Sequence, residues 1–325
     1  MNKDQLKYPI KFIPILKEKI WGGNKLNSIF NKTSKKNIGE SWEISGIDNT
    51  ISIVNNGFLK GVPLSQLIIN FKGDFLGNRV YKTFGNNFPL LFKYIDAKED
   101  LSVQLHPNDQ LAKERHNSFG KTEMWYVLDA DRNAKLILGF HKKIDQDLYQ
   151  KHLAENTLSE ILQYENVKKG DSFFIETGMV HAIGAGVVLA EIQQTSDITY
   201  RIYDYNRPGL DGKLRELHTD LAIGTISFEN KKAKLEYKDE LNIPISLCKS
   251  KYFHTNKLSI SSPIHRDLSL IDSFIVYMCL EGEGSIKVNQ YSEKFKGGDT
   301  VLIPALIKNI EIISKSAIFL EVYVP

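Results

Sequence analysis

Cysteine is scarce in this sequence, with only Cys248 and Cys279 among 325 residues. Both lie in apolar runs and outside any close-spaced metal-binding pattern, so we expect buried free thiols. So few cysteines argue against a disulfide framework and favour a reducing compartment. We therefore expect a cytoplasmic protein.

A strong charge excess is also absent. The 42 Lys and Arg residues are balanced by 39 Asp and Glu residues, which leaves a net charge of +3. This balance gives no electrostatic basis for binding nucleic acid or an anionic membrane. No hydrophobic run is long enough to span a bilayer, and the N-terminal stretch MNKDQLKYPIKFIPILKEKIWGG lacks the uninterrupted apolar core of a signal peptide. We expect a soluble protein with neither of these partners.

The sequence does contain many short segments typical of β-strands. Segments rich in Val, Ile, Phe and Tyr, bounded by Gly, Asn, Asp or Pro, predict strands within residues 49–57, 87–97, 124–140 and 187–205. From about residue 232 to the C-terminus, short strands and turns continue with no clear helix. Many short strands with regular turns are typical of a β-sandwich, a jelly roll or a barrel.

Three segments predict helices. Within residues 143–167, apolar residues recur at roughly helical spacing, which predicts two short helices with a break near Thr157 or Ser159. The segments SQLIINFKGDFLG (65–77) and NDQLAKERHNSFG (108–120) also read as helices that end at glycine.

A long-period repeat links two parts of the chain. The segment KKGDSFFIETGMVHAI resembles KGGDTVLIPALIKNI at an offset of 128 residues, and EMWYVLDA resembles IVYMCLEG. These matches place Glu123 opposite Ile275 and His181 opposite Asn309. Because the second copy lacks both side chains, their role should belong to the first copy only.

The repeat also predicts the domain organisation. The first copy has 58 residues from Glu123 to His181, and the second has 34 from Ile275 to Asn309, so the first holds 24 more. This surplus matches the helical stretch 143–167. A chain of this length also favours two domains. We predict a first β-unit over residues 1–231, with a small helical insertion, and a second over 232–325 without metal ligands.

Several polar side chains in the first unit could bind a metal. Gln104 and His106, in LSVQLHPND, lie two residues apart and so share one face of a strand. With Glu123 and His181 they would supply imidazole nitrogen, carboxylate oxygen and amide oxygen, and the first two of these donor types are common zinc ligands. The alternative is that both histidines are ordinary core or surface residues, because no short motif ties these ligands together.

Five motifs in order carry a family resemblance: GESWEISG, FPLLFKYIDAKEDLSVQLHPND, GKTEMWYVLDA, GMVHAIGAGVVLAEIQQTSDITYRIYDYNR and LRELH. Together they resemble type I mannose-6-phosphate isomerase (phosphomannose isomerase) in its short bacterial form. The resemblance runs from about Trp21 to His218 and continues more weakly to the C-terminus. It implies two cupin-type jelly-roll units and interconversion of mannose 6-phosphate and fructose 6-phosphate through a cis-enediol.

The resemblance also implies one zinc ion per chain, held by Gln104, His106, Glu123 and His181. A metal-dependent cupin enzyme of another kind, such as an iron oxygenase, remains an alternative. So does a non-catalytic sugar-phosphate-binding protein. We expect a monomer or a weak homodimer.

The remaining site residues are also implied by the resemblance. Arg201 would stabilise the enediolate or orient the sugar, and its alternative is a strand arginine paired with Asp197 or Asp204. Lys121 and Ser102 would line the substrate pocket and offer donors to the phosphate. Their alternatives are a solvated surface lysine and a strand serine without a special role.

The base that moves the carbon-bound proton is open at this point. Glu191 and Asp197 follow His181 along the chain and are the carboxylate candidates. A coordinated water or Lys121 could serve instead.

Overall fold

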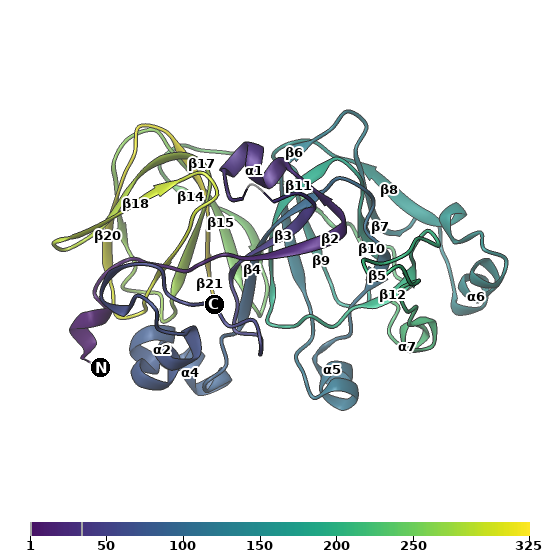
Figure 1. Cartoon of the computed structure of the whole chain (residues 1–325), viewed down its shortest axis with the longest axis horizontal. Helices are drawn as coiled ribbons and strands as arrows, with labels where there is room; N and C mark the ends of the chain where they lie inside the picture. The colour runs from purple at the N-terminus through teal and green to yellow at the C-terminus, as the bar shows by residue number, and fades with distance from the viewer. Residues whose placement is uncertain (1, 34) are drawn as a thin grey trace.

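A computed structural model describes residues 2–33 and 35–325. Two β-rich units lie side by side, with the strands β5 to β12 on the right of Figure 1 and most of the C-terminal unit on the left, above the N-terminus and the helices α2 and α4. Short helices lie around the edges of both units. The chain is mainly β, as the sequence predicts.

The strands are β1 (Ile10–Lys11), β2 (Ile15–Gly23), β3 (Ile38–Ile44), β4 (Leu90–Ala97), β5 (Val103–Leu105), β6 (Glu123–Ala130), β7 (Lys135–Phe140), β8 (Leu162–Asn166), β9 (Ser172–Ile175), β10 (His181–Ile183), β11 (Val187–Gln194), β12 (Tyr200–Tyr203), β13 (Lys234–Leu235), β14 (Pro244–Lys249), β15 (His254–Ile260), β16 (Ile264–Asp267), β17 (Ile275–Val288), β18 (Tyr291–Lys296), β19 (Thr300–Ile303), β20 (Asn309–Ile313) and β21 (Ala317–Tyr323).

The α-helices are α1 (Lys25–Phe30), α2 (Leu64–Phe71), α3 (Gly73–Leu76), α4 (Asn78–Phe84), α5 (Asp109–His116), α6 (Gln146–Ala154) and α7 (Thr219–Ile223). The short 3-10 helices are η1 (Lys3–Leu6), η2 (Gly57–Leu59) and η3 (Leu158–Glu160).

Two antiparallel sheets form the first unit. The larger has the strand order β13-β9-β6-β11-β4-β2-β3, and the smaller has the order β12-β5-β10-β7-β8. Trp125 and Phe173 of the larger sheet pack with Leu136 and Ile183 of the smaller one in a shared core. The helices α6 and α7 cover the outer face of the smaller sheet. The first unit is therefore a sandwich whose inner faces could enclose a site.

The larger sheet is buried on both faces. Along β4, Phe92 and Tyr94 pack into a core that also holds Val276 and Leu320 of the second unit. The alternate residue Ile95 packs into the core between the two sheets of the first unit. Burial on both sides explains why β4 and β11 read as nearly continuous apolar runs rather than as alternating ones.

The second unit repeats the strand pairing of the first. Its central order β19-β17-β21-β15 corresponds to β9-β6-β11-β4. Glu123 pairs with Ile175 between β6 and β9, and Ile275 pairs with Ile303 between β17 and β19. These are the positions that the sequence repeat aligns, so the two copies share one register.

Two short strands each pair with a sheet of the other unit. Ile10–Lys11 of β1 pairs with β19 of the second unit, and Lys234–Leu235 of β13 pairs with β9 of the first. The division of the chain at residue 231 stays a prediction.

Most of the predicted elements are present. Residues 87–97, 124–140 and 187–205 contain β4, the pair β6 and β7, and the pair β11 and β12. The helices α2 and α3 lie in the first of the three predicted helical segments, α5 in the second and α6 in the third, whereas α1, α4 and α7 are additional helices.

Two predictions about secondary structure are wrong. Residues 49–57 form only single β-bridges, from Val54 to Phe12 and from Ile53 to Pro63, because no neighbouring strand pairs along this segment. The second predicted helix of residues 143–167 is the short turn η3 followed by β8, which extends the smaller sheet. The apolar residues Leu158, Ile161 and Leu162 of this stretch are buried, but in a turn and a strand rather than in a helix.

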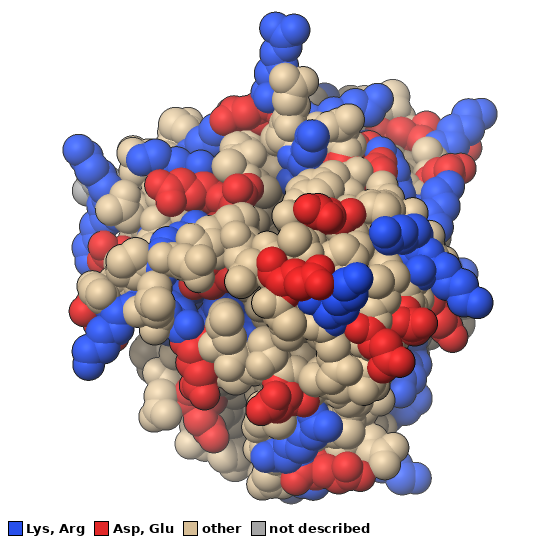
Figure 2. Space-filling view, turned by 90° about the vertical axis from the view of Figure 1, so that its right-hand side faces the viewer, with Lys and Arg blue, Asp and Glu red and all other residues tan. Residues whose placement is uncertain are grey.

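Both cysteines are buried and free, as expected. Burial raises the pKa of the Cys248 thiol to about 12, so the unreactive thiol form prevails near neutral pH. Among the described residues, no helix has the length and apolar character that a bilayer crossing requires. Figure 2 shows acidic and basic side chains interspersed over the face that lies at the right of Figure 1.

Candidate metal centre and substrate cavity

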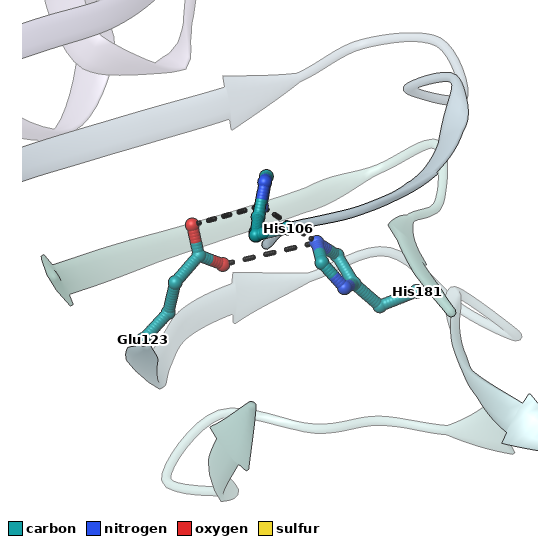
Figure 3. A group of neighbouring side chains, drawn as sticks. All are labelled: His106, Glu123 and His181. Atoms are coloured by element: carbon teal, nitrogen blue, oxygen red, sulfur yellow. Dashed lines mark hydrogen bonds and ion pairs between the residues drawn. The ribbon is translucent and has the colours of Figure 1, made fainter. Parts of the chain in front are cut away.

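His106, Glu123 and His181 meet in the first unit (Figure 3). His106 follows β5 and His181 begins β10, so both come from the smaller sheet, whereas Glu123 begins β6 of the larger sheet. The Nε2 atoms of the two histidines are 3.2 Å apart. Glu123 Oε1 lies 3.3 Å from His106 Nε2, and Glu123 Oε2 lies 3.9 Å from His181 Nε2. One donor group from each of three segments therefore faces the same point.

The second nitrogen of each ring fixes its orientation. Nδ1 of His106 contacts the carbonyl oxygen of Ile198 at 2.9 Å, and Nδ1 of His181 contacts that of Met179 at 2.9 Å. A carbonyl only accepts, so each Nδ1 carries the proton and donates. Each Nε2 then presents a lone pair toward the other ring and toward Glu123. Metal-ligating histidines have this arrangement, because a fixed second nitrogen sets the tautomer.

Both rings are held in the neutral form that binds metals. Burial, and next the ammonium of Lys121, lower the pKa of His106 to about 3. Burial also lowers the pKa of His181. Neutral imidazole is the ligand form, so neither ring has to lose a proton before it binds a cation near neutral pH.

Glu123 adds a buried negative charge to this point. Its side chain is 1% exposed and Lys121 Nζ lies 2.7 Å from its Oε1, while its Oε2 is buried without a hydrogen bond in the described structure. Burial opposes its ionisation, but the ammonium of Lys121 holds the pKa of its carboxyl well below the usual range. A buried carboxylate with free lone pairs, next to two imidazole lone pairs, fits a divalent metal ion.

The other predicted site residues line a single cavity next to this point. The cavity has a volume of about 220 Å³. It is lined by Lys19, Trp21, Glu40, Trp42, Lys93, Ile95, Leu101, Ser102, Gln104, Lys121, Trp125, Ile183, Glu191, Asp197, Thr199, Arg201 and Arg215. The structure thus brings together all six of the predicted residues that lie outside the His/Glu/His group.

Gln104 and Lys121 connect the cavity with the metal centre. Gln104 pairs with His181 on one side and with Arg201 on the other, and its Oε1 accepts from the Ser102 hydroxyl at 3.3 Å. Lys121 Nζ lies 2.7 Å from Glu123 Oε1. Lys121 is therefore a buried residue of the site, and its alternative as a solvated surface lysine is wrong.

Arg201 reaches the cavity without a carboxylate partner among the described residues. Its Nη1 donates to the carbonyl oxygen of Glu216 at 2.8 Å, and its Nε is buried without a hydrogen bond. Asp204 instead binds Arg215, whose Nε lies 2.6 Å from Asp204 Oδ2. Asp197 is exposed. The alternative that Arg201 is a strand arginine paired with either aspartate is wrong.

Both carboxylate oxygens of Glu191 are engaged by neighbouring side chains. Lys93 Nζ lies 2.7 Å from its Oε1, and Trp125 Nε1 donates to its Oε2 at 2.9 Å. Burial, and next the charge of Glu123, raise the pKa of the Glu191 carboxyl. A carboxylate with both oxygens engaged has to give up a hydrogen bond before it can accept a proton from a substrate.

The second unit contains a similarly bridged carboxylate. Glu321 lies between Tyr277 and Asn256 in the sheet, as Glu191 lies between Trp125 and Lys93. The Tyr277 hydroxyl donates to Glu321 at 2.7 Å, and Asn256 donates to it at 2.9 Å. A carboxylate bridged by its two strand neighbours is thus a feature of both copies of the fold.

Comparisons with known proteins indicate the same family along most of the chain. Residues 10–140 match the family model for the catalytic domain of type I phosphomannose isomerase, and residues 245–323 match the cupin domain of mannose-6-phosphate isomerase. Mannose-6-phosphate isomerase ManA of Bacillus subtilis is 36% identical over 301 residues, covering 91% of this chain and 93% of the relative. The chain belongs to the type I phosphomannose isomerase family. It is therefore an isomerase by family, and this family is metal-dependent.

A second curated relative and a solved structure indicate the same family. The mannose-6-phosphate isomerase of Streptococcus mutans is 35% identical and covers 90% of this chain and 91% of its own length. The crystal structure of the mannose 6-phosphate isomerase from Bacillus subtilis superposes with a TM-score of 0.89 at 30% identity, covering 97% of this chain and 99% of that one. The predicted cupin-type fold is confirmed.

Several residues that line this cavity were not predicted from the sequence. Lys19, Glu40, Trp42, Lys93 and Arg215 line the cavity but were not predicted. Trp42 Nε1 donates to Glu40 at 2.6 Å. Burial opposes the ionisation of Glu40, but Lys19 and Lys93 lower the pKa of its carboxyl to about 2. A lysine in the middle of the apolar run LLFKYI was the signal that could have identified Lys93.

Metal analysis of purified protein tests the centre. We expect one tightly bound divalent ion per chain, because three buried donors converge. The variants His106→Ala and His181→Ala should lose it, whereas His141→Ala should retain it, since His141 contacts the Glu160 carbonyl at 2.7 Å, away from the group. Elemental analysis by inductively coupled plasma mass spectrometry gives the stoichiometry. Full metal content in His181→Ala would contradict the assignment.

Proposed function

We propose that this chain interconverts mannose 6-phosphate and fructose 6-phosphate, using a zinc ion held by Gln104, His106, Glu123 and His181. The observation that carries the proposal is the convergence of two imidazole lone pairs and a buried carboxylate beside a polar cavity. The names of the curated relatives support the substrate pair. Two nitrogen and one carboxylate donor suit zinc, with Gln104 as a fourth, neutral ligand.

Zinc would supply a redox-inactive Lewis acid that stabilises negative charge on the substrate oxygens. The reaction itself moves a proton between C2 and C1 through a cis-enediol. The protein must therefore position a proton carrier near these carbons and stabilise charge on two adjacent oxygens. It must also bind a phosphate at the far end of the sugar.

Lys121 is our preferred proton carrier. It lies 2.7 Å from Glu123 and 3.2 Å from Nε2 of His106, and it faces the cavity. A general acid–base group must first lie within reach of the substrate, and this position of the amine meets that requirement. Glu191 and Asp197 are weaker alternatives, because the first is held by Lys93 and Trp125 and the second is exposed.

Arg201 and its neighbours would bind the anionic parts of the substrate. A guanidinium stays charged and can fork onto two oxygens. We assign Arg201 to the enediolate or to sugar orientation, because it has unused donor capacity and lies beside Gln104. Ser102 and Arg215 then offer a hydroxyl and a cation to the phosphate from other positions on the cavity wall.

The remaining assignments are proposals of the same kind. We propose a division into units 1–231 and 232–325, supported by two family models that fall on either side of it. A cytoplasmic location, supported by the scarcity of cysteine, and a monomeric or weakly dimeric state stay predictions.

A coupled assay tests the activity directly. Mannose 6-phosphate should be converted to fructose 6-phosphate, turnover should fall to background after removal of metal with a chelator, and added zinc should restore it. Binding of mannose 6-phosphate without turnover would instead identify a non-catalytic sugar-phosphate-binding protein. Turnover that requires iron and oxygen would identify a different metal-dependent cupin enzyme.

The variant Arg201→Ala tests the proposed anion stabilisation. We expect kcat to fall on the order of 10²- to 10³-fold, as for other lost oxyanion donors, with metal content unchanged because Arg201 contacts none of the three convergent metal donors. Arg132→Ala, at an exposed position, is the matched control. Near-normal turnover in Arg201→Ala would remove this residue from the mechanism.

A further inference from the structure

The C-terminal unit contributes none of the described residues that line the cavity, since all of them precede residue 232. It nevertheless contacts the segment that carries a metal ligand. The turn between β14 and β15 places Tyr252 against the start of α5, where its hydroxyl donates to Oδ2 of Asp109 at 2.6 Å. Asp109 lies three residues after His106 in the motif HPND.

The other oxygen of Asp109 binds the segment that leads into β6. Oδ1 of Asp109 accepts from the backbone amide of Gly120 at 3.1 Å and from Nε2 of Gln194 at 2.9 Å. Gln194 Oε1 in turn accepts from the backbone amide of Thr122 at 2.9 Å. The two backbone amides flank Lys121. One carboxylate and one amide side chain therefore fix the backbone on both sides of the proposed proton carrier.

The two segments touch backbone to backbone at this place. A Cβ atom on Gly120 would lie 2.7 Å from the backbone nitrogen of Asp109 and 2.9 Å from the carbonyl carbon of Asn108. The amide of Lys121 also donates to the carbonyl oxygen of Pro107 at 3.3 Å. Glycine permits this approach because it has no side chain. Asp109 thus links two segments, the one that follows His106 and the one that leads into Glu123.

We propose that Asp109 is a positioning residue for the metal centre, and that Tyr252 couples it to the C-terminal unit. Asp109 does not line the cavity, so it acts through the segments that carry His106, Lys121 and Glu123. Ligands already held in place lose less freedom when they bind an ion. The C-terminal unit then serves the reaction by supporting this contact rather than by covering the cavity. The proposal rests on the proposed function, because it assumes that His106 and Glu123 bind a metal.

Metal affinity separates positioning from simple interface stability. The variants Tyr252→Phe and Asp109→Ala are compared with the unmodified protein by competition for zinc against a chromophoric chelator. We expect about tenfold weaker zinc binding in each, as for other residues that support metal ligands. Tyr237→Phe is the matched control, because the Tyr237 hydroxyl also joins residues beyond 232 to the first unit, donating to the Gly170 carbonyl at 2.7 Å. Tyr237→Phe should bind zinc as tightly as the unmodified protein.

The double variant adds a second check. If both side chains act through one contact, Tyr252→Phe should have little further effect on zinc affinity when Asp109 is already alanine. Should Asp109→Ala fail to fold, Tyr252→Phe alone decides, because it keeps the ring and removes only the hydroxyl. A lower melting temperature with unchanged zinc affinity in Tyr252→Phe would overturn the inference. Failure of the unmodified protein to bind zinc or isomerise the sugar would instead overturn the proposed function.

Discussion

The burial of Glu123 is the constraint on which the site depends. A carboxylate that is removed from water costs much free energy unless positive charge or hydrogen-bond donors compensate it. Here the compensation comes from Lys121, at 2.7 Å, while the neutral rings of His106 and His181 present lone pairs instead of donors. Two imidazole lone pairs and a buried carboxylate thus face one another, an arrangement that a bound cation would complete. The sandwich positions them by bringing the ends of two sheets together.

The internal repeat distinguishes features of the fold, which both copies share, from the candidate site residues, which only the first copy has. Both copies keep a buried glutamate bridged by its strand neighbours, Glu191 in the first and Glu321 in the second. The first copy has Glu123 and His181 where the second has Ile275 and Asn309. Because the strand registers correspond, this difference is one of side chains on an equivalent backbone. The family comparison places the catalytic domain model in the first copy as well.

The sequence predicted the elements whose pattern is local. Runs of β-branched and aromatic residues bounded by turn residues predicted β4, β6 and β11, and the repeat singled out Glu123 and His181, which the structure brings together. Pairing between segments that are far apart in the chain was harder to predict from local patterns. Residues 49–57 have strand-like composition but no partner strand, and residues 158–162 fit helical spacing although they form a turn and a strand. Lys93 was missed for the same reason, since its contact with Glu191 depends on strands that are far apart in the chain.

Anomalous diffraction from crystals at the zinc absorption edge would locate the ion itself. We expect a single strong peak between the Nε2 atoms of His106 and His181 and the carboxylate of Glu123, with Gln104 completing the coordination. The peak should vanish below the edge. A protein that isomerises mannose 6-phosphate while showing no peak at this point, or a peak bound by other residues, would contradict the proposed metal site.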